Sequence, residues 1–161
     1  MDILVRYAAR NELERVNELR ELVNTVHVNG RPDIFRAGFC DELKNHIYQM
    51  YDGDHSDVLV AVIDGYICGF ATVDYIDKPL SPYNLARSYY HIEEFGVDQN
   101  YRRQGVASSL IRFAKKEAAQ KGYRKIELDM WEFNDSALEF YEDAGFKTYR
   151  RYMELEADVE S

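Results

Sequence analysis

The residues best suited to chemistry lie between Glu93 and Leu110. An apolar strand end, Phe95–Val97, leads through a polar turn into the stretch Arg102–Ala107, and an amphipathic helix follows. The first turn of a helix has unpaired backbone N–H groups, and the helix dipole favours negative charge there. The glycine of this turn lets a ligand approach the backbone, and its two arginines add positive charge. The order therefore predicts a binding site for a phosphorylated ligand, formed by Arg102, Arg103, Gln104, Gly105, Val106 and Ala107.

Two other phosphate-binding loops do not fit this stretch. A P-loop needs a glycine followed by Lys-Ser or Lys-Thr, which is absent from the sequence. A dinucleotide-binding loop needs three glycines, and this turn contains only Gly105. Taken alone, the six residues are also consistent with a plain helix cap that carries solvated arginines.

Two motifs together resemble the GNAT superfamily of acetyl-CoA-dependent N-acetyltransferases. The pattern Arg-x-x-Gly-x-Ala, carried by Arg102, Gly105 and Ala107, is similar to the family's pyrophosphate loop. Downstream, the segment Asn134–Phe146 resembles the family pattern Asn-x-x-Ala-x-x-x-Tyr-x-x-x-Gly-Phe. The resemblance covers nearly the whole chain. It implies acetyl-CoA as co-substrate. The turn Arg102–Ala107, called the cradle below, would hold it together with Phe95, Val97 and Asn134.

Acetyl transfer to an amine requires a base, because an alkyl ammonium has a pKa of ~10.4 and must be deprotonated before it attacks. Presenting the neutral amine at pH 7 costs roughly 4–5 kcal/mol. Some GNAT proteins that act on small amines carry a glutamate four residues before the strand's valine, the position of Glu93. Glu94 is the second candidate, His91 the third, and Asp129 corresponds to a base of some protein N-terminal acetylases. Alternation along a strand predicts His91, Glu93 and Val97 on one face and Glu94 on the other.

The leaving thiolate needs a proton donor, and the resemblance assigns this role to Tyr141. Asn134 is expected to cap the helix that carries Tyr141 and to meet the cofactor's pantetheine arm with its amide. Backbone N–H groups at the strand end near Val97 are candidates for holding the thioester oxygen. The alternative for Tyr141 is a core aromatic residue beside Phe140.

The elements that must position these groups can be read from periodicity. Strands are expected at 3–8, 58–63, 66–75, 89–97, 124–130 and 146–155. Helices are expected from Asn11, which has Glu14 three residues on as a capping box, to Gly30, and then at 37–51, 106–121 and from 134 to before Gly145. Asp64-Gly65 predicts a hairpin turn. His46 lies beside the apolar stripe of the second helix and is interpreted as a packing residue. The loop Lys78–Ser88 is a candidate wall of the acceptor pocket, and the segment Arg31–Phe35 is expected on the acceptor side.

The order β-α-α-β-β-β-α-β-α-β predicts an α/β (α+β) fold of GNAT type. The hairpin gives an antiparallel first half, and the strand–helix–strand unit of the second half gives a parallel crossover. The expected result is a mixed, twisted sheet with helices on both faces. The 161 residues, 46% of them hydrophobic, predict one domain spanning 1–161.

Charge and composition exclude several functions. The net charge of −9 argues against a nucleic-acid partner and is compatible with a cationic substrate, although solubility alone also explains it. No signal peptide or membrane span is evident. The histidines lack metal-ligand spacing, so no metal is expected. Cys40 and Cys68 are expected to be reduced in a cytoplasmic protein.

These observations together predict an N-acetyltransferase that moves acetyl from acetyl-CoA to a primary amine by direct attack. Neither cysteine lies in a motif, which favours direct transfer over a covalent enzyme intermediate. A small cationic amine is the expected acceptor. The alternatives are a protein N-terminus or lysine, a non-catalytic domain that senses acetyl-CoA, and a structural interaction domain. GNAT proteins are often dimers, so a homodimer is a further expectation.

Overall fold

The computed structural model describes residues 2–158 and falls into two compact units, Met1–Asp129 and Met130–Ser161. The first unit contains a five-stranded sheet in the order β1-β2-β3-β4-β5. Neighbouring strands pair antiparallel except β4 and β5, which are parallel, so the predicted mixed sheet is confirmed. The strands are β1 (Leu4–Tyr7), β2 (Ser56–Ile63), β3 (Tyr66–Lys78), β4 (Arg87–Val97) and β5 (Ile126–Glu127).

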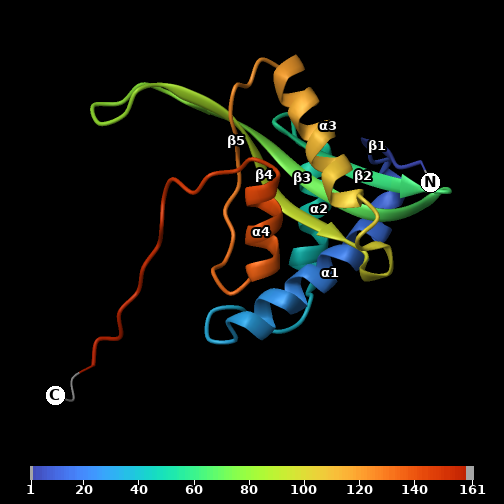
Figure 1. Cartoon of the computed structure of the whole chain (residues 1–161), viewed down its shortest axis with the longest axis horizontal. Coiled ribbons are helices and arrows are strands. Elements are labelled where there is room, and N and C mark those ends of the chain that lie inside the picture. The colour runs from blue at the N-terminus through green and yellow to red at the C-terminus, as the bar shows by residue number, and fades with distance from the viewer. Residues whose placement is uncertain (1, 159–161) are drawn as a thin grey trace. The chain divides into compact units, whose positions relative to one another are not determined.

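Helices cover both faces of this sheet (Figure 1). On one face α1 (Leu13–Gly30) and α2 (Asp41–Asp52) pack against alternate residues of β2, and on the other face lies α3 (Val106–Gln120). The first face is closed by a core that contains Leu13, Val16, Leu19, Ile47, Met50, Val58, Val60, Val62 and Phe70. Burial of this apolar area holds the helices in place and thereby fixes any side chain that they point at β4.

Two glycines let the helices approach the strands closely. A Cβ on Gly96 of β4 would lie 2.8 Å from Val23 Cγ2 of α1 and 2.9 Å from the ring of Phe70. A Cβ on Gly69 of β3 would lie 2.8 Å from Val106 Cγ1 of α3. Both helices therefore sit against backbone at the end of the sheet where β4 finishes.

The strand β4 continues beyond its pairing with β5. The parallel register is Tyr90 with Ile126 and His91 with Glu127, and β4 then runs on to Val97. Among residues 2–158 no further residue pair joins β4 to β5. After His91, β4 therefore has no strand partner on its β5 side. The predicted strand at 124–130 is correspondingly reduced to two residues, because the neighbouring strands separate.

The hairpins follow their turn chemistry. Asp64 and Gly65 have φ values of +50° and +78°, as the predicted turn between β2 and β3 requires. The β3–β4 hairpin is longer than expected, because its ladder extends to the pair Lys78–Arg87. Its tip projects from the sheet (Figure 1).

The start of α1 differs from the prediction. Asn11 lies within a short 3₁₀ helix, Arg10–Glu12, and α1 begins at Leu13. Instead of an Asn11 cap, the carboxylate of Glu12 accepts a hydrogen bond from the backbone N–H of Ala9 at 2.7 Å. The same Glu12 carboxylate forms an ion pair with Arg6 of β1 at 2.8 Å. This tertiary contact favours Glu12 over Asn11 as the residue that caps the helix start.

The second unit contains α4 (Asp135–Asp143), capped as predicted by Asn134, whose Oδ1 accepts a hydrogen bond from the N–H of Ala137 at 3.3 Å. The predicted last strand, 146–155, is wrong, since the described residues of this segment form no strand. A strand requires ladder hydrogen bonds from a neighbour, and alternation of residue types does not supply them.

Candidate functional site

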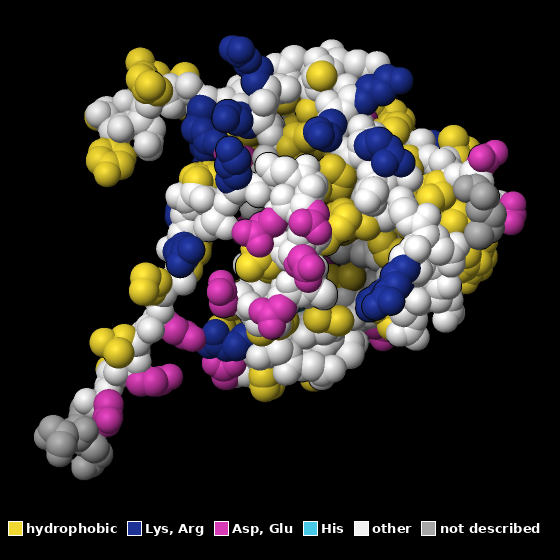
Figure 2. Space-filling view, in the orientation of Figure 1, with side chains coloured by type: hydrophobic (Ala, Val, Ile, Leu, Met, Phe, Trp, Pro, Cys, Tyr) yellow, Lys and Arg dark blue, Asp and Glu magenta, His cyan; other side chains and the backbone are white. Residues whose placement is uncertain are grey.

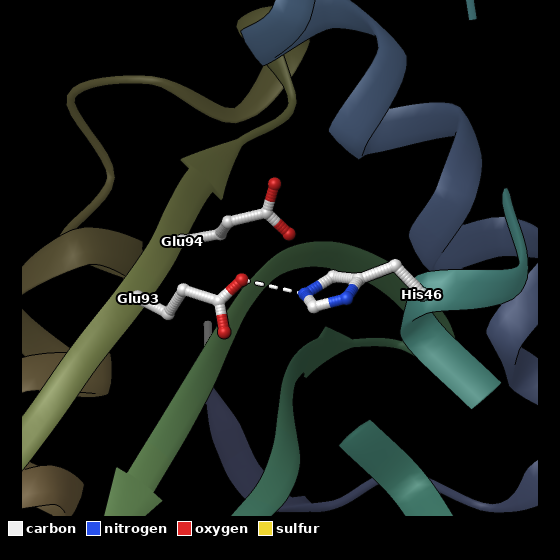
Figure 3. Close-up of side chains that lie close together, drawn as sticks. All are labelled: His46, Glu93 and Glu94. Atoms are coloured by element: carbon white, nitrogen blue, oxygen red, sulfur yellow. Dashed lines mark hydrogen bonds and ion pairs between the residues drawn. The ribbon is translucent and has the colours of Figure 1, made fainter. Parts of the chain in front are cut away.

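A β-bulge shapes the middle of β4. Thr72 of β3 pairs with Glu94, and the next residue, Val73, pairs with Ile92, so Glu93 is an extra residue on β4. The Glu94 N–H donates to Thr72 Oγ1 at 3.0 Å. A bulge interrupts strict alternation of side chains. As a result both carboxylates point toward the same side chain, His46 of α2 (Figure 3), and the predicted placement of Glu93 and Glu94 on opposite faces is wrong.

The Glu93 carboxylate contacts His46. Its Oε1 lies 2.6 Å from His46 Nε2 (Figure 3). Glu93 is half-buried, with 28% of its side chain exposed. Burial raises the pKa of the Glu93 carboxyl above its usual range, while the contact with His46 opposes this rise. A raised pKa makes a carboxylate a stronger base, which suits it to accept a proton from an ammonium group.

Glu94 is bound differently, by a buried arginine of α1. Arg20 Nε lies 2.7 Å from Glu94 Oε1, and 2% of the Arg20 side chain is exposed. Arg20 also donates to Asn17 Oδ1 at 2.8 Å and to the Leu43 carbonyl at 2.6 Å. This ion pair occupies the Glu94 carboxylate, whereas no contact between Arg20 and Glu93 is seen among the described residues. Of the two adjacent carboxylates, Glu93 is therefore the better placed to act as a base.

The ligand atoms of His46, Glu93 and Glu94 lie within 4.8 Å of one another, close enough to share a divalent metal ion. The sequence prediction of no metal did not foresee this grouping, because the three residues come from two separate elements. The nearby guanidinium of Arg20 already neutralises one of the three ligands. This cation opposes the binding of a second positive charge.

The other base candidates lie close by but are less suited to the role. His91 Nδ1 is 3.4 Å from Asp74 Oδ2 of β3. Hydrogen bonding to Asp74 raises the pKa of His91, which favours the charged imidazolium over the neutral ring that could accept a proton. Asp129 is exposed at the end of the first unit.

The predicted phosphate cradle folds as a turn that exposes backbone. Gly105 is the N-cap of α3 with φ +86° and ψ 12°, and Arg103 has φ +63°. A glycine cap supplies no side chain to the first N–H groups of α3, and no side-chain hydrogen bond is made there. Arg102, Arg103 and Gln104 are exposed, while Val106 is buried and anchors the helix. These donors and charges fit an anionic diphosphate.

The turn is braced from α1. Asp98, directly after β4, accepts hydrogen bonds from the N–H of Asn100 at 2.9 Å and from Arg15 at 2.7 Å. Its own N–H donates to the Cys68 carbonyl at 2.8 Å. The strand end at Phe95–Val97 therefore enters the turn along a fixed path. Because β4 is unpaired with β5 here, the strand edge is available to an extended ligand.

The loop predicted as a pocket wall lies at the far end of the β3–β4 hairpin. Arg87, where the ladder ends, is six residues from Glu93, about 20 Å along a strand. Within one chain, this loop is too distant to line the space at Glu93. On α1, by contrast, His27 stacks on Phe35 of the predicted acceptor-side segment, with 5.1 Å between ring centroids.

The second unit carries Asn134 and Tyr141. Asn134 uses its Oδ1 as the cap of α4. Burial raises the pKa of Tyr141 to about 12, so its phenol stays protonated at neutral pH and can donate. Its ring makes edge contacts with Phe140 and Phe146, 5.4 and 5.6 Å between centroids, so it is also part of an aromatic cluster. The described residues do not place either residue relative to Glu93.

The model of the acetyltransferase (GNAT) family matches residues 16–146 of the chain. The chain belongs to the GNAT family. It is therefore an acyltransferase, and the matched range includes both the turn Arg102–Ala107 and the segment Asn134–Phe146.

Individual GNAT relatives differ in their acceptors. The chain is 27% identical over 157 residues to the L-amino acid N-acetyltransferase AaaT of Escherichia coli, covering 91% of this chain and 83% of that protein. It is 28% identical over 97 residues to the L-ornithine N5-acetyltransferase NATA1 of Arabidopsis thaliana, covering 60% of this chain and 38% of that protein.

Solved structures agree on the fold. A mutant of the BH1408 protein from Bacillus halodurans superposes with a TM-score of 0.90 at 28% identity, covering 94% of this chain and 98% of that one. The aminoglycoside N-acetyltransferase AAC(6')-Iy in complex with CoA superposes with a TM-score of 0.73 at 21% identity, covering 96% and 93%. The mixed GNAT sheet is thus confirmed.

Sequence reasoning missed Arg20 and misread His46. Arg20 lies seven residues after Leu13, so it falls on the buried face of α1, and a charge on that face was the available signal. His46, interpreted as a packing residue, in fact contacts Glu93. No local pattern links α2 to the bulge of β4, so that contact had no signal in the sequence.

Proposed function

We propose that this protein transfers acetyl from acetyl-CoA directly to the primary amine of a small cationic acceptor, with Glu93 as general base and Tyr141 as general acid. The observation that carries the proposal is the half-buried Glu93 carboxylate. The bulge leaves Glu93 without a ladder partner on β3, and Arg20 pairs with Glu94 instead of Glu93. Glu94 is the anchored neighbour of the base.

The acetyl donor is supported by the fit of the cradle. The first N–H groups of α3, behind Gly105, would bind the diphosphate of CoA together with Arg102, Arg103 and Gln104. The open edge of β4 from Phe95 to Val97 would accept the pantetheine arm, and Asn134 would meet the same arm. The aminoglycoside acetyltransferase solved with CoA is 21% identical to this chain and supports the fold alone, so the proposal of the donor depends on the turn Arg102–Ala107.

The proposed reaction is balanced without a covalent enzyme intermediate. Glu93 accepts one proton from the acceptor's ammonium, either directly or through a water molecule. The neutral nitrogen then bonds to the thioester carbon, the carbon–sulfur bond breaks, and the nitrogen loses a second proton to water as the amide forms. The thiolate takes the phenolic proton of Tyr141, which is later replaced from solvent. The products are an amide, free CoA and one released proton. Cys40 is exposed and Cys68 is buried, and neither lies in the turn Arg102–Ala107.

The acceptor class is supported by charge. The chain carries a net charge of −9, and acidic side chains gather over α4 (Figure 2). The exposed carboxylates of that helix are Asp135, Glu139, Glu142 and Asp143. A negative surface attracts cations over several ångströms. AaaT and NATA1 act on amino acids, as their names state, and an aminoglycoside acetyltransferase has been solved with sisomicin. Basic amino acids, polyamines and aminoglycosides are therefore the acceptors to test first.

The deciding experiment is a turnover screen in which free thiol is measured after mixing protein, acetyl-CoA and one amine at a time. The panel includes ornithine, lysine, spermidine, an aminoglycoside, neutral amino acids and a peptide with a free N-terminus. We expect turnover on small cations above that on the neutral amines. Turnover on the peptide alone would replace the small-molecule acceptor with a protein. Acetyl-CoA binding without turnover on any amine would identify a sensor domain.

Three further features belong to the same proposal. The two units form one acetyltransferase domain, since the family's match runs from residue 16 to 146 across both. The protein acts in the cytoplasm, where both free cysteines stay reduced. It forms a homodimer that covers exposed apolar side chains such as Met153 and Leu155, which are 92% and 94% exposed.

The dimer has its own test. Light scattering after size exclusion should give twice the chain mass, and Met153→Lys with Leu155→Lys should give the monomer mass. Tyr83→Lys, at another exposed apolar position, is the matched control. A monomeric wild type would contradict the homodimer proposal and leave the enzyme proposal unaffected.

Within residues 2–158, none of the helices combines the length and the apolar character that a membrane span requires.

A further inference from the structure

We propose that His46 is the positioning residue of Glu93 and that it relays the acceptor's proton from the Glu93 carboxylate to solvent. This inference rests on the proposed role of Glu93 as the base. It adds a residue of α2 to the candidate site on β4.

The geometry suits positioning. The 2.6 Å contact between His46 Nε2 and Glu93 Oε1 joins two elements far apart in sequence. The next residue along α2, Ile47, is fully buried, and Met50 is 6% exposed, so the helix is held firmly against the sheet. Glu93 itself lies in the bulge, where it lacks a ladder partner opposite it on β3. His46 therefore supplies a fixed contact to a side chain whose backbone is irregular.

The geometry also suits a relay. The His46 side chain is 36% exposed and that of Glu93 is 28% exposed, so the imidazole is the more open of the pair. Imidazole has two nitrogens, and one can accept a proton while the other releases one. His46 Nε2 takes the proton that Glu93 received from the ammonium, and His46 Nδ1 loses one to water. The carboxylate is restored for the next turnover, and the net change is one proton delivered to solvent.

The charged and titratable groups around Glu93 and His46 have partners of their own. From α1, Arg20 binds Glu94. From the two strands, Asp74 and His91 contact each other. His27 of α1 stacks on Phe35, and burial lowers its pKa, which favours the neutral ring. Each of these groups has a partner other than Glu93, and His46 is the group that contacts the base.

Two substitutions separate positioning from relay. His46→Gln keeps an amide that can hold the carboxylate but cannot pass a proton on. His46→Ala removes both functions and leaves space for free imidazole. We expect kcat to fall about 10-fold in His46→Gln and about 100-fold in His46→Ala, within the range of general base effects. The KM for acetyl-CoA should stay within about twofold, because the cradle is on another element.

The pH profile and rescue give the decisive readouts. Added imidazole should restore part of the activity of His46→Ala and none of that of His46→Gln, and both deficits should shrink as pH approaches the pKa of the amine, ~10.4. His55→Gln, at an exposed histidine before β2, is the matched control and should be unchanged. Wild-type rates for both variants at every pH would overturn the proposal, as would a His46→Ala deficit that imidazole and pH leave unaltered.

A titration without turnover distinguishes this failure from that of the proposed function. In ¹³C NMR of glutamate-labelled protein, the Glu93 carboxyl is assigned by its loss in Glu93→Gln. Since the His46 contact opposes the effect of burial, His46→Ala should move the Glu93 midpoint upward by about half a pH unit or more. An unchanged midpoint in a folded variant would show that His46 does not act on Glu93, even if no acceptor were ever found.

Discussion

The guanidinium of Arg20 lies 2.7 Å from the carboxylate of Glu94, and it is buried in the core between α1 and the sheet. The pair distinguishes two adjacent carboxylates, because Glu94 contacts the guanidinium of Arg20 whereas Glu93 contacts the imidazole of His46. The bulge that turns both side chains to one face creates the need for such a pair, since two close carboxylates repel.

Removing Arg20 should destabilise the fold. In Arg20→Met, Glu94 remains three-quarters buried without its cation, and we expect the free energy of unfolding to fall by about 2–4 kcal/mol, measured by urea denaturation. The double variant Arg20→Met with Glu94→Gln should recover part of the loss. Arg10→Met, which breaks the exposed pair with Asp52, is the control and should cost less than about 1 kcal/mol. Equal losses in the two single variants would contradict a buried, structural role for Arg20.

Glu93→Gln should lower kcat/KM about 100-fold at pH 7 and progressively less toward pH 10. The sign follows from the acceptor, because its ammonium loses its proton unaided as pH approaches ~10.4. In the wild type, the raised pKa of Glu93 means that activity should fall as pH drops through a value above the ordinary glutamate range. Thiol release across pH 5–10 measures both. Glu94→Gln is the matched variant, and a loss in Glu93→Gln that is equal at every pH would remove Glu93 as the base.

Tyr141→Phe should reduce kcat about 10-fold while acetyl-CoA still binds with unchanged affinity, because the substitution deletes only the hydroxyl that donates to the thiolate. Burial keeps this phenol protonated, with a pKa of about 12, so the wild type should retain its acid well above neutral pH. Isothermal calorimetry gives the affinity and thiol release gives kcat. Phe140→Leu tests the aromatic cluster alone. If calorimetry finds binding lost in Tyr141→Phe, the residue serves packing.

Gly105→Ala should weaken acetyl-CoA binding about 10-fold or more. An alanine at φ +86° is strained by about 1 kcal/mol, and relief of this strain would shift the turn that presents the first N–H groups of α3. Gly122→Ala has the same φ at the other end of α3 and should lose similar stability with no effect on binding. Urea denaturation and calorimetry on both variants separate strain from ligand contact. Equal binding in both would place the diphosphate elsewhere.

His91→Gln should lower the free energy of unfolding more at acid pH than at alkaline pH. The pKa of His91 is raised by Asp74, so the ion pair stabilises the fold fully below the unfolded value of about 6.5 and is lost as pH rises through the folded value. We expect a loss of about 0.5–1 kcal/mol at pH 5.5 that largely disappears by pH 9, measured by urea denaturation. A larger loss at pH 9 than at pH 5.5 would reverse the assigned direction.

The local features of this protein were determined by the sequence itself. The Asp64-Gly65 turn, the Gly105 turn before α3, the Asn134 cap and the apolar stripes of α1 and α3 each depend on residues a few positions apart. Backbone preferences and helical periodicity act over that range, so the element order up to α4, the mixed sheet and the glycine turn before α3 could be predicted. The strand predicted at 146–155 is absent from the structure. Alternation of residue types is a property of one segment, whereas a strand also needs a neighbouring strand to hydrogen-bond with.

The catalytic arrangement was decided by tertiary structure. Whether Glu93 and Glu94 share a face depends on a pairing between Thr72 and Glu94 that skips one residue, and alternation along β4 alone gives the opposite answer. Which carboxylate is free depends on Arg20, 74 residues away, and which side chain holds Glu93 depends on His46, 47 residues away. Charge pairing and burial are set by neighbours in space, so the proposal of Glu93 as the base depends on the packing of α1, α2 and β4.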